Sequence, residues 1–257
     1  MLAAAPAAAA QAGGRIVAKG RLKQSVCRWC YAKIPAPEFF KAVADMGLTA
    51  VDLLTEKDWP IARDHGLICS MGSGFGGSIA DGLKRGIPIA AANKVPNLIT
   101  FFGNRRGMGD PEAAANCVEA LNQVKGVAEE HGVTICVELL NSKVDHKDYQ
   151  GDHSAFGVGI VKAVGSPRVK LLYDIYHMQI MEGDVIRTIR ESQDAFAHFH
   201  TGGVPGRHEL DDTQELNWRT IAAAIADTGF QGYFAHEFVP VRDPLTSLRQ
   251  AVALCDV

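Results

Sequence analysis

Short runs of apolar residues recur along the chain and alternate with longer stretches of helical periodicity. Eight runs have the length and composition of buried β-strands: residues 22–27, 50–54, 67–71, 97–102, 133–138, 169–174, 196–200 and 233–237. Eight helix candidates follow them in turn: residues 37–46, 59–65, 83–93, 111–131, 153–164, 184–192, 218–228 and 244–255. This alternation predicts a single-domain α/β protein, a (β/α)8 TIM barrel, rather than an open sheet with a second domain.

The predicted helix ends carry the residues that usually mark them. Gly47, Gly132 and Gly229 come just after predicted C-termini, where a left-handed residue commonly ends a helix. Asp110 precedes Pro111, as expected for an N-cap followed by a proline at the first helical position. These local signals agree with the strand and helix pattern.

The first 14 residues differ from the rest, which forms one barrel domain over residues 15–257. They are rich in alanine and include Ala10-Gln11-Ala12, a small-x-small pattern of the kind signal peptidase cuts, but they lack a basic region. We interpret residues 1–14 either as the remnant of an export signal or as a disordered leader. We therefore expect a cytoplasmic protein, with an exported, periplasmic protein as the alternative.

Charge and composition narrow the class of partner. The formal net charge is -3 and no block of like charges is present, which argues against nucleic acid or an anionic membrane as the main partner. No run approaches the roughly 18 apolar residues of a membrane-spanning helix. The six cysteines are scattered, and the Cys27–Cys30 C-x-x-C spacing has no second pair beside it, so we expect no metal site there. A small-molecule substrate is the expected partner.

Candidate chemistry lies where the last four predicted strands end. Strands five to eight end at Glu138, Asp174, His200 and Glu237 respectively, and the C-terminal ends of the strands form the active-site face of such a barrel. Three carboxylates in a partly desolvated mouth would repel one another unless protons or a cation joined them. Three oxygen ligands and one imidazole suit manganese, magnesium or cobalt. The sequence therefore predicts one divalent metal ion bound by these four residues.

Four further polar residues follow the same strands and are candidates for binding substrate. Asn141 and Lys143 follow strand five, His177 comes three residues after Asp174, and Arg207 follows strand seven. A helix-capping or surface position is the alternative for His177, and a surface ion pair is the alternative for Arg207. Strands five and eight are not neighbours in an eight-stranded ring, so we expect the two glutamates to face each other across the substrate.

Four stretches of the chain carry a family resemblance: residues 138–148 (ELLNSKVDHKD), 173–179 (YDIYHMQ), 204–209 (VPGRHE) and 232–237 (GYFAHE). At these residues the sequence resembles the hydroxypyruvate isomerase family within the xylose isomerase-like barrels. The resemblance implies that the four strand-end residues bind the metal, that the two glutamates also act as acid and base, and that His177 and Arg207 hold substrate. It also implies a homodimer or homotetramer.

The expected reaction interconverts an α-hydroxy ketone and an aldehyde of a small sugar or sugar acid through a cis-enediolate. At position 200, many hydroxypyruvate isomerases have glutamine, whereas this chain has histidine, as epimerases do. A ketose or keto-glycoside epimerase or lyase is therefore the alternative. A barrel nuclease would call for more histidines and a basic groove, and a non-enzymatic binding protein would need no acid/base pair.

Overall fold

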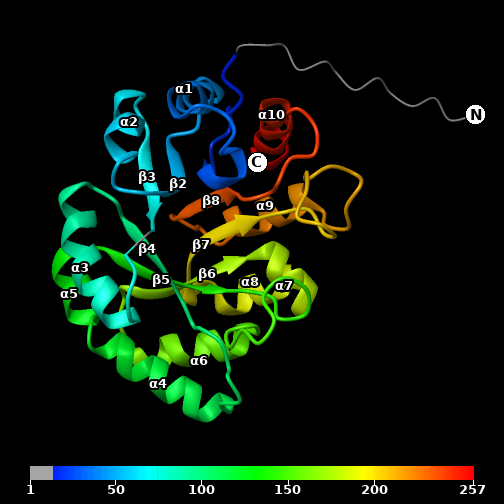
Figure 1. The fold of residues 1–257 in the computed structure, drawn as a ribbon. Helices are drawn as coiled ribbons and strands as arrows, with labels where there is room; N and C mark the ends of the chain where they lie inside the picture. The colour runs from blue at the N-terminus through cyan, green and yellow to red at the C-terminus, as the bar shows by residue number, and fades with distance from the viewer. Residues whose placement is uncertain (1–13, 74) are drawn as a thin grey trace, which may run out of the picture.

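The computed structural model describes residues 14–73 and 75–257, which form a barrel of parallel strands surrounded by helices (Figure 1). The strands are β1 (Lys23–Val26), β2 (Ala50–Leu54), β3 (Ile68–Gly72), β4 (Asn97–Phe101), β5 (Thr134–Leu139), β6 (Val169–Asp174), β7 (Phe196–Thr201) and β8 (Tyr233–His236). Most of the predicted leader, residues 1–13, lies outside the described residues.

The helices and short 3-10 turns connect successive strands. They are η1 (Arg28–Tyr31), α1 (Ala36–Met46), α2 (Trp59–Asp64), α3 (Ile79–Ala92), α4 (Asp110–Asn122), α5 (Lys125–His131), α6 (Ser154–Val164), α7 (Ile175–Met181), α8 (Val185–Ser192), η2 (Gln193–Ala195), α9 (Trp218–Asp227) and α10 (Pro244–Cys255).

The strand order confirms the predicted barrel. The strands are hydrogen-bonded in parallel in the order β1-β8-β7-β6-β5-β4-β3-β2, and a parallel bridge between Cys27 and Asp52 joins β1 to β2 and completes the ring. β5 and β8 are separated by β6 and β7. The carboxyl ends of all eight strands therefore meet at one mouth.

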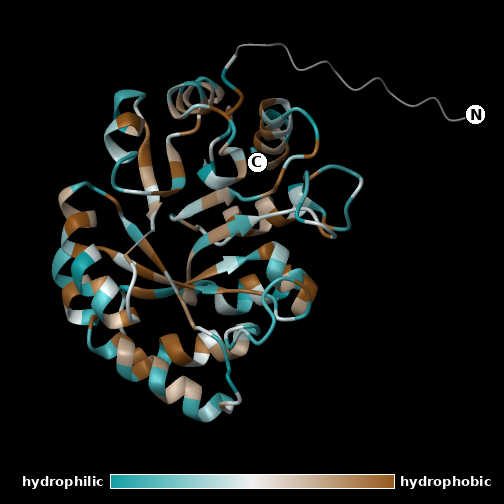
Figure 2. Cartoon of the chain, in the orientation of Figure 1, coloured by the Kyte–Doolittle hydropathy of each residue, from teal (hydrophilic) through white to brown (hydrophobic). Residues whose placement is uncertain are grey.

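The core forms because each helix buries one apolar stripe against the strands. In α1, Phe39, Phe40, Val43 and Met46 are buried, a spacing that places them on one side of a 3.6-residue helix. The helix ends at Gly47, whose φ of 93° lies in the left-handed region that favours glycine. Figure 2 shows hydrophobic and hydrophilic residues alternating along the outer helices, as expected for helices with one buried side.

Three of the differences between the predicted and the observed helix boundaries can be traced to particular residues. The predicted helix 111–131 is two helices, because the backbone leaves the helical region at Val124, which is fully buried and marked by no glycine or proline. α3 begins at Ile79 rather than at residue 83, since the Ser78 side chain accepts a hydrogen bond from the Asp81 amide and caps it. Gly109, not Asp110, occupies the N-cap of α4.

α7 was not predicted, and it matters for the site because it follows β6 without a loop. The Asp174 side chain accepts a hydrogen bond from the backbone N–H of His177 and so caps this helix.

In the described part of the chain, no helix has the length and apolar character needed to cross a membrane.

Candidate active site

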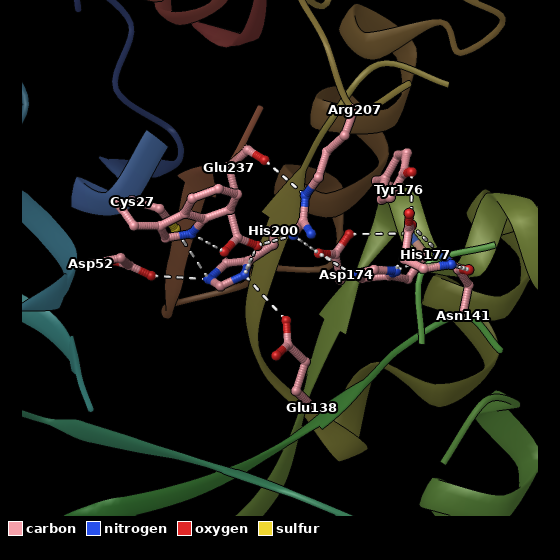
Figure 3. Close-up of polar contacts among 12 residues, drawn as sticks. Cys27, Asp52, Glu138, Asn141, Asp174, Tyr176, His177, His200, Arg207 and Glu237 are labelled. Atoms are coloured by element: carbon pink, nitrogen blue, oxygen red, sulfur yellow. Dashed lines mark hydrogen bonds and ion pairs between the residues drawn. The ribbon is translucent and has the colours of Figure 1, made fainter. Parts of the chain in front are cut away.

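Four buried side chains converge at the mouth of the barrel. Glu138 lies near the end of β5, Asp174 ends β6, His200 lies near the end of β7, and Glu237 follows β8 directly. None is more than 5% exposed. Each can offer one ligand atom, and these four atoms lie within 4.8 Å of one another. The structure thus brings together the four residues that the sequence predicts as metal ligands (Figure 3).

The His200 imidazole has two different sides. Its Nδ1 atom is 2.7 Å from a Glu237 oxygen and 3.5 Å from a Glu138 oxygen, yet it has no hydrogen bond of good geometry within the described residues. Its Nε2 atom is 3.2 Å from Asp52 Oδ2. A carboxylate behind one nitrogen of an imidazole is the usual arrangement when the other nitrogen binds a metal.

Asp52 is a functional candidate that the sequence analysis missed. This fully buried carboxylate accepts hydrogen bonds from Ser25 Oγ at 2.6 Å and from Ser70 Oγ, and it lies 2.5 Å from His198 Nε2. Burial alone would raise the pKa of Asp52, but His198 and His200 outweigh burial and hold it well below its usual range. The signal in the sequence was a carboxylate in the middle of an apolar run.

Burial and the neighbouring charges shift the pKa values of the clustered carboxylates in different directions. Burial raises the pKa of Glu138, and burial with the nearby Glu237 charge raises the pKa of Asp174 to about 6. Burial opposes ionisation of Glu237 too, but the charges of His200 and Arg207 outweigh it and lower the pKa. Three carboxylate oxygens and Nδ1 of His200, which lies among them, fit a divalent cation, which would relieve the repulsion between the carboxylates.

Protonation of His200 is coupled to the same cluster. Burial opposes its charged form, but contacts with Cys27, Glu237 and Asp52 raise the pKa of His200 well above the usual range. A proton on Nδ1 would have to leave before that nitrogen could bind a cation, so metal binding here should release a proton.

Arg207 contacts two of the candidate ligands from the β7–α9 loop. One guanidinium nitrogen lies 2.9 Å from Asp174 Oδ2 and 2.5 Å from Glu237 Oε2. The guanidinium lies over the rings of Trp29 and Tyr176, 5.5 and 5.2 Å from their centroids. Its φ of 58° is uncommon for a residue other than glycine and is the kind of backbone strain found at functional sites. The surface ion pair considered for Arg207 is not what the structure shows.

Trp29, the second residue that the sequence analysis missed, fixes the other oxygen of Glu237. Its indole N–H donates to Glu237 Oε1 at 2.6 Å, while the side chain remains 44% exposed. In the sequence, Trp29 stands between Cys27 and Cys30, within a C-x-x-C spacing that points to the thiols and not to the indole. The two Glu237 oxygens therefore have separate partners, Trp29 on one and Arg207 with His200 on the other.

The remaining predicted substrate residues lie in different surroundings. His177 is fully buried on α7, with Nε2 3.6 Å from Asp174 Oδ2, and burial together with the Arg207 charge lowers its pKa well below the usual range. Asn141 is also fully buried and contacts His177. The Lys143 ammonium donates to the carbonyls of Ile180 and Met181 at the end of α7, 3.0 Å from each.

A cavity of about 730 Å³ opens beside the candidate ligands. Its polar lining includes Glu138, Glu237, Arg207 and His146, and much of the rest is apolar, with Phe75 and Phe101 among its residues. Of the four predicted substrate residues, Arg207 is part of this lining, whereas Asn141, Lys143 and His177 are not. Glu138 and Glu237 reach the site from strand positions separated by β6 and β7, and Figure 3 shows them on either side of the His200 ring.

Among the described residues, no group of potential metal ligands contains both cysteines of the C-x-x-C pair. Cys27 and Cys30 are free thiols, and Cys30 belongs to neither group of potential ligands found there. The second such group joins Cys27 to Asp52 and His200, with the thiol sulfur 3.7 Å from His200 Nε2. It shares His200 with the first group and therefore adds no independent site.

The chain is similar to known proteins both in sequence and in fold. Residues 7–256 match the family model described as xylose isomerase-like TIM barrel. The protein named "Putative hydroxypyruvate isomerase" of Homo sapiens is 27% identical over 225 residues, covering 86% of this chain and 80% of that protein. A 2-oxo-tetronate isomerase of Cupriavidus necator is 32% identical over 126 residues, 49% of this chain and 48% of its own length. The crystal structure of an AP endonuclease, family 2, from Brucella melitensis has a TM-score of 0.79 and 25% identity, covering 88% of this chain and 97% of that one.

Proposed function

Because the chain belongs to the xylose isomerase-like TIM barrel family, we propose that it is a metal-dependent isomerase of a small hydroxycarbonyl sugar or sugar acid. Relatives of this chain are named as isomerases, and the chain is an enzyme of this sugar isomerase and epimerase class. The observation that carries the finer proposal is the convergence of three carboxylates and Nδ1 of His200, whose four candidate ligand atoms lie within 4.8 Å of one another.

Glu138, Asp174, His200 and Glu237 would hold the cation, which we propose to be manganese, magnesium or cobalt. When bound, it would polarise the carbonyl and the adjacent hydroxyl of the substrate and make the intervening C–H proton more acidic. Arg207 balances the negative charge of this cluster, since it contacts Asp174 and Glu237. Trp29 restricts Glu237 to one orientation by occupying its other oxygen.

Proton transfer is the task we propose for the two glutamates. Glu138 and Glu237 approach from strands on either side of the site, so a substrate held between them exposes each face of its reacting carbon to one carboxylate. In a 1,2-isomerisation, one glutamate would remove the C–H proton to give a cis-enediolate, and the proton would return to the neighbouring carbon, while the hydroxyl proton passes from one substrate oxygen to the other. In an epimerisation, the opposite glutamate returns a proton to the same carbon.

The epimerase alternative rests on this two-sided arrangement and on His200. Both outcomes use the same residues, and the difference lies in which carbon receives the proton. Nuclease activity is a further alternative to consider, because one structural relative is named an AP endonuclease. Cleavage by several metals would call for further independent ligand groups. In the described residues, the second candidate group shares His200 with the first, which favours one metal and carbonyl chemistry.

The test is a substrate panel in deuterated water. Hydroxypyruvate, ketoses and keto-sugars would be incubated with the protein and manganese, magnesium or cobalt, and deuterium in substrate and product followed by NMR. Exchange at the carbon next to the carbonyl supports the proposal, and the product shows whether the enzyme isomerises or epimerises. Failure to exchange the proton of any panel member with any of the metals would reject the proposed reaction.

Glu138→Gln and Glu237→Gln are each expected to lower the rate at least about 100-fold, because glutamine retains one coordinating oxygen but cannot accept a proton. Metal binding, measured by calorimetry, should largely remain. Glu191→Gln is the matched control, since it makes the same change at an exposed position. Wild-type turnover and exchange in Glu237→Gln would exclude the two-glutamate mechanism.

A further inference from the structure

The side chain of Asn141 can be oriented without ambiguity. Its Oδ1 atom accepts hydrogen bonds from the backbone N–H groups of Val144 and Asp145, each at 2.9 Å. Backbone N–H groups can only donate, so the atom that faces them must be the amide oxygen. The amide nitrogen therefore occupies the opposite end of the side chain.

That amide nitrogen determines where His177 carries its proton. Asn141 Nδ2 lies 2.7 Å from Asp145 Oδ2 and 2.6 Å from His177 Nδ1. An amide nitrogen donates and does not accept, so His177 Nδ1 must accept the hydrogen bond and cannot be protonated. The ring is then neutral and its proton is on Nε2.

The protonated nitrogen is the one that faces the site. His177 Nε2 is buried and has no hydrogen-bond partner within the described part of the chain. It lies 3.6 Å from Asp174 Oδ2, the same oxygen that Arg207 contacts. Figure 3 shows His177 between Asn141 and Asp174, with the candidate ligands beyond. His177 does not line the cavity itself, but a buried N–H group without a partner can donate to an oxygen that binds at the adjacent cluster of candidate ligands.

We propose that Asn141 is a positioning residue that fixes the Nε2–H tautomer of His177, so that His177 donates a hydrogen bond to an oxygen of the bound hydroxycarbonyl substrate. This inference rests on the proposed function. The donated hydrogen bond stabilises negative charge that develops on that oxygen when the neighbouring C–H proton is removed. Asn141 itself touches no substrate, since its oxygen and nitrogen are all engaged.

The rest of the network holds Asn141 in place. Asp145 Oδ2 accepts hydrogen bonds from both Asn141 Nδ2 and the Tyr176 hydroxyl, at 2.7 and 2.8 Å. The loop after β5 is thereby joined to α7 through two adjacent residues, Tyr176 and His177. A variant that exchanges the amide of Asn141 and the carboxylate of Asp145 would keep the total charge and the number of side-chain hydrogen-bond donors at these two positions.

The test is the double variant Asn141→Asp/Asp145→Asn. An aspartate at 141 still accepts the two backbone hydrogen bonds, but its second oxygen accepts from His177 Nδ1, which moves the proton away from Nε2. The tautomer would be read from the ring nitrogens by NMR of histidine-labelled protein. The sample would contain Mg²⁺ at a pH above the ordinary pKa of histidine. The signals of His177 would be assigned by their loss in His177→Gln. Asp145→Asn alone is the control, because it retains the amide at 141.

We expect an Nε2–H tautomer in the wild type and in Asp145→Asn, and an Nδ1–H tautomer in the double variant. The double variant should lose about 100-fold in kcat, the effect typical of removing one oxyanion donor, with little change in KM or in metal affinity. An Nδ1–H or doubly protonated His177 in the wild type would overturn the proposal even if the variants failed to fold. Wild-type kcat in a double variant with the altered tautomer would also overturn it. Absence of turnover by the wild type would reject the proposed function, whereas the tautomer is decided by NMR alone.

Discussion

Replacing Asp52 with asparagine is expected to weaken metal binding although Asp52 is not itself one of the four proposed ligands. The carboxylate lies 3.2 Å from His200 Nε2 and 2.5 Å from His198 Nε2, and Ser25 and Ser70 donate to its other oxygen. Asparagine can still accept from the two hydroxyl groups through its oxygen. The change therefore removes the negative charge behind His200 and places an amide nitrogen, which donates and does not accept, beside the Nε2 atoms of His198 and His200.

The expected magnitude follows from the position of that charge. A carboxylate behind a ligating imidazole orients the ring and makes its free nitrogen more basic, and losing such a partner typically costs 10- to 100-fold in metal affinity. This corresponds to about 1.4–2.8 kcal/mol at 25 °C. The loss should fall at the upper end of this range, because Asp52 is fully buried and solvent cannot replace its charge.

The assay is calorimetric titration of the metal-free protein with Mn²⁺, with thermal unfolding recorded on the same samples. Asp45→Asn is the matched control, since Asp45 forms an exposed ion pair with Lys41 on α1. The control should leave the metal affinity unchanged. An Asp52→Asn protein that is folded and binds Mn²⁺ as tightly as the wild type would refute the view that Asp52 supports His200 as a ligand.

Two further changes test other parts of the structure. Trp29→Phe removes the indole N–H that donates to Glu237 Oε1. Since hydrogen bonds to charged groups contribute about 1.5–3 kcal/mol, we expect kcat to fall at least about 10-fold, while the metal affinity measured by calorimetry stays nearly unchanged. An unchanged kcat would contradict the role proposed for Trp29. Burial lowers the pKa of His236 to about 3, whereas the unfolded chain takes up the proton near pH 6.5. His236 therefore contributes stability that is present above about pH 6.5 and is lost as the pH falls toward 3. Thermal unfolding of His236→Gln should show a shallower loss of stability over that range than the wild type, and equal slopes would exclude His236 as a source of the acid sensitivity.

The sequence predicts the barrel and the candidate ligands because both depend on local order along the chain. Each strand is an apolar run of its own, and the residue at its end faces the mouth wherever parallel strands close into a ring. Glu138 and Asp174 could thus be identified without knowing any contact across the barrel. The same reasoning identifies His200 and Glu237, although Glu237 follows its strand rather than ending it.

What the sequence could not predict depends on contacts between distant segments. Asp52 contacts His198, which lies 146 residues away in the sequence, and Trp29 contacts Glu237, which lies 208 residues away. The pattern of apolar and polar residues along the chain does not predict such long-range contacts. Loop residues show a related difficulty, since position after a strand does not fix the direction of a side chain. Asn141 turns toward His177, and Lys143 turns toward the end of α7.

Asp52 also has a consequence for the order in which the chain can reach its native state. Its partners come from β1, β3 and β7, since Ser25, Ser70 and the two histidines of β7 all contact it. During synthesis, the first three strands leave the ribosome long before residues 196–201 follow. Until β7 arrives, a carboxylate in the centre of the apolar interior has no imidazole beside it, and burying an unpaired charge is strongly unfavourable. We therefore expect native packing of the first three strands around an ionised Asp52 to follow the arrival of β7.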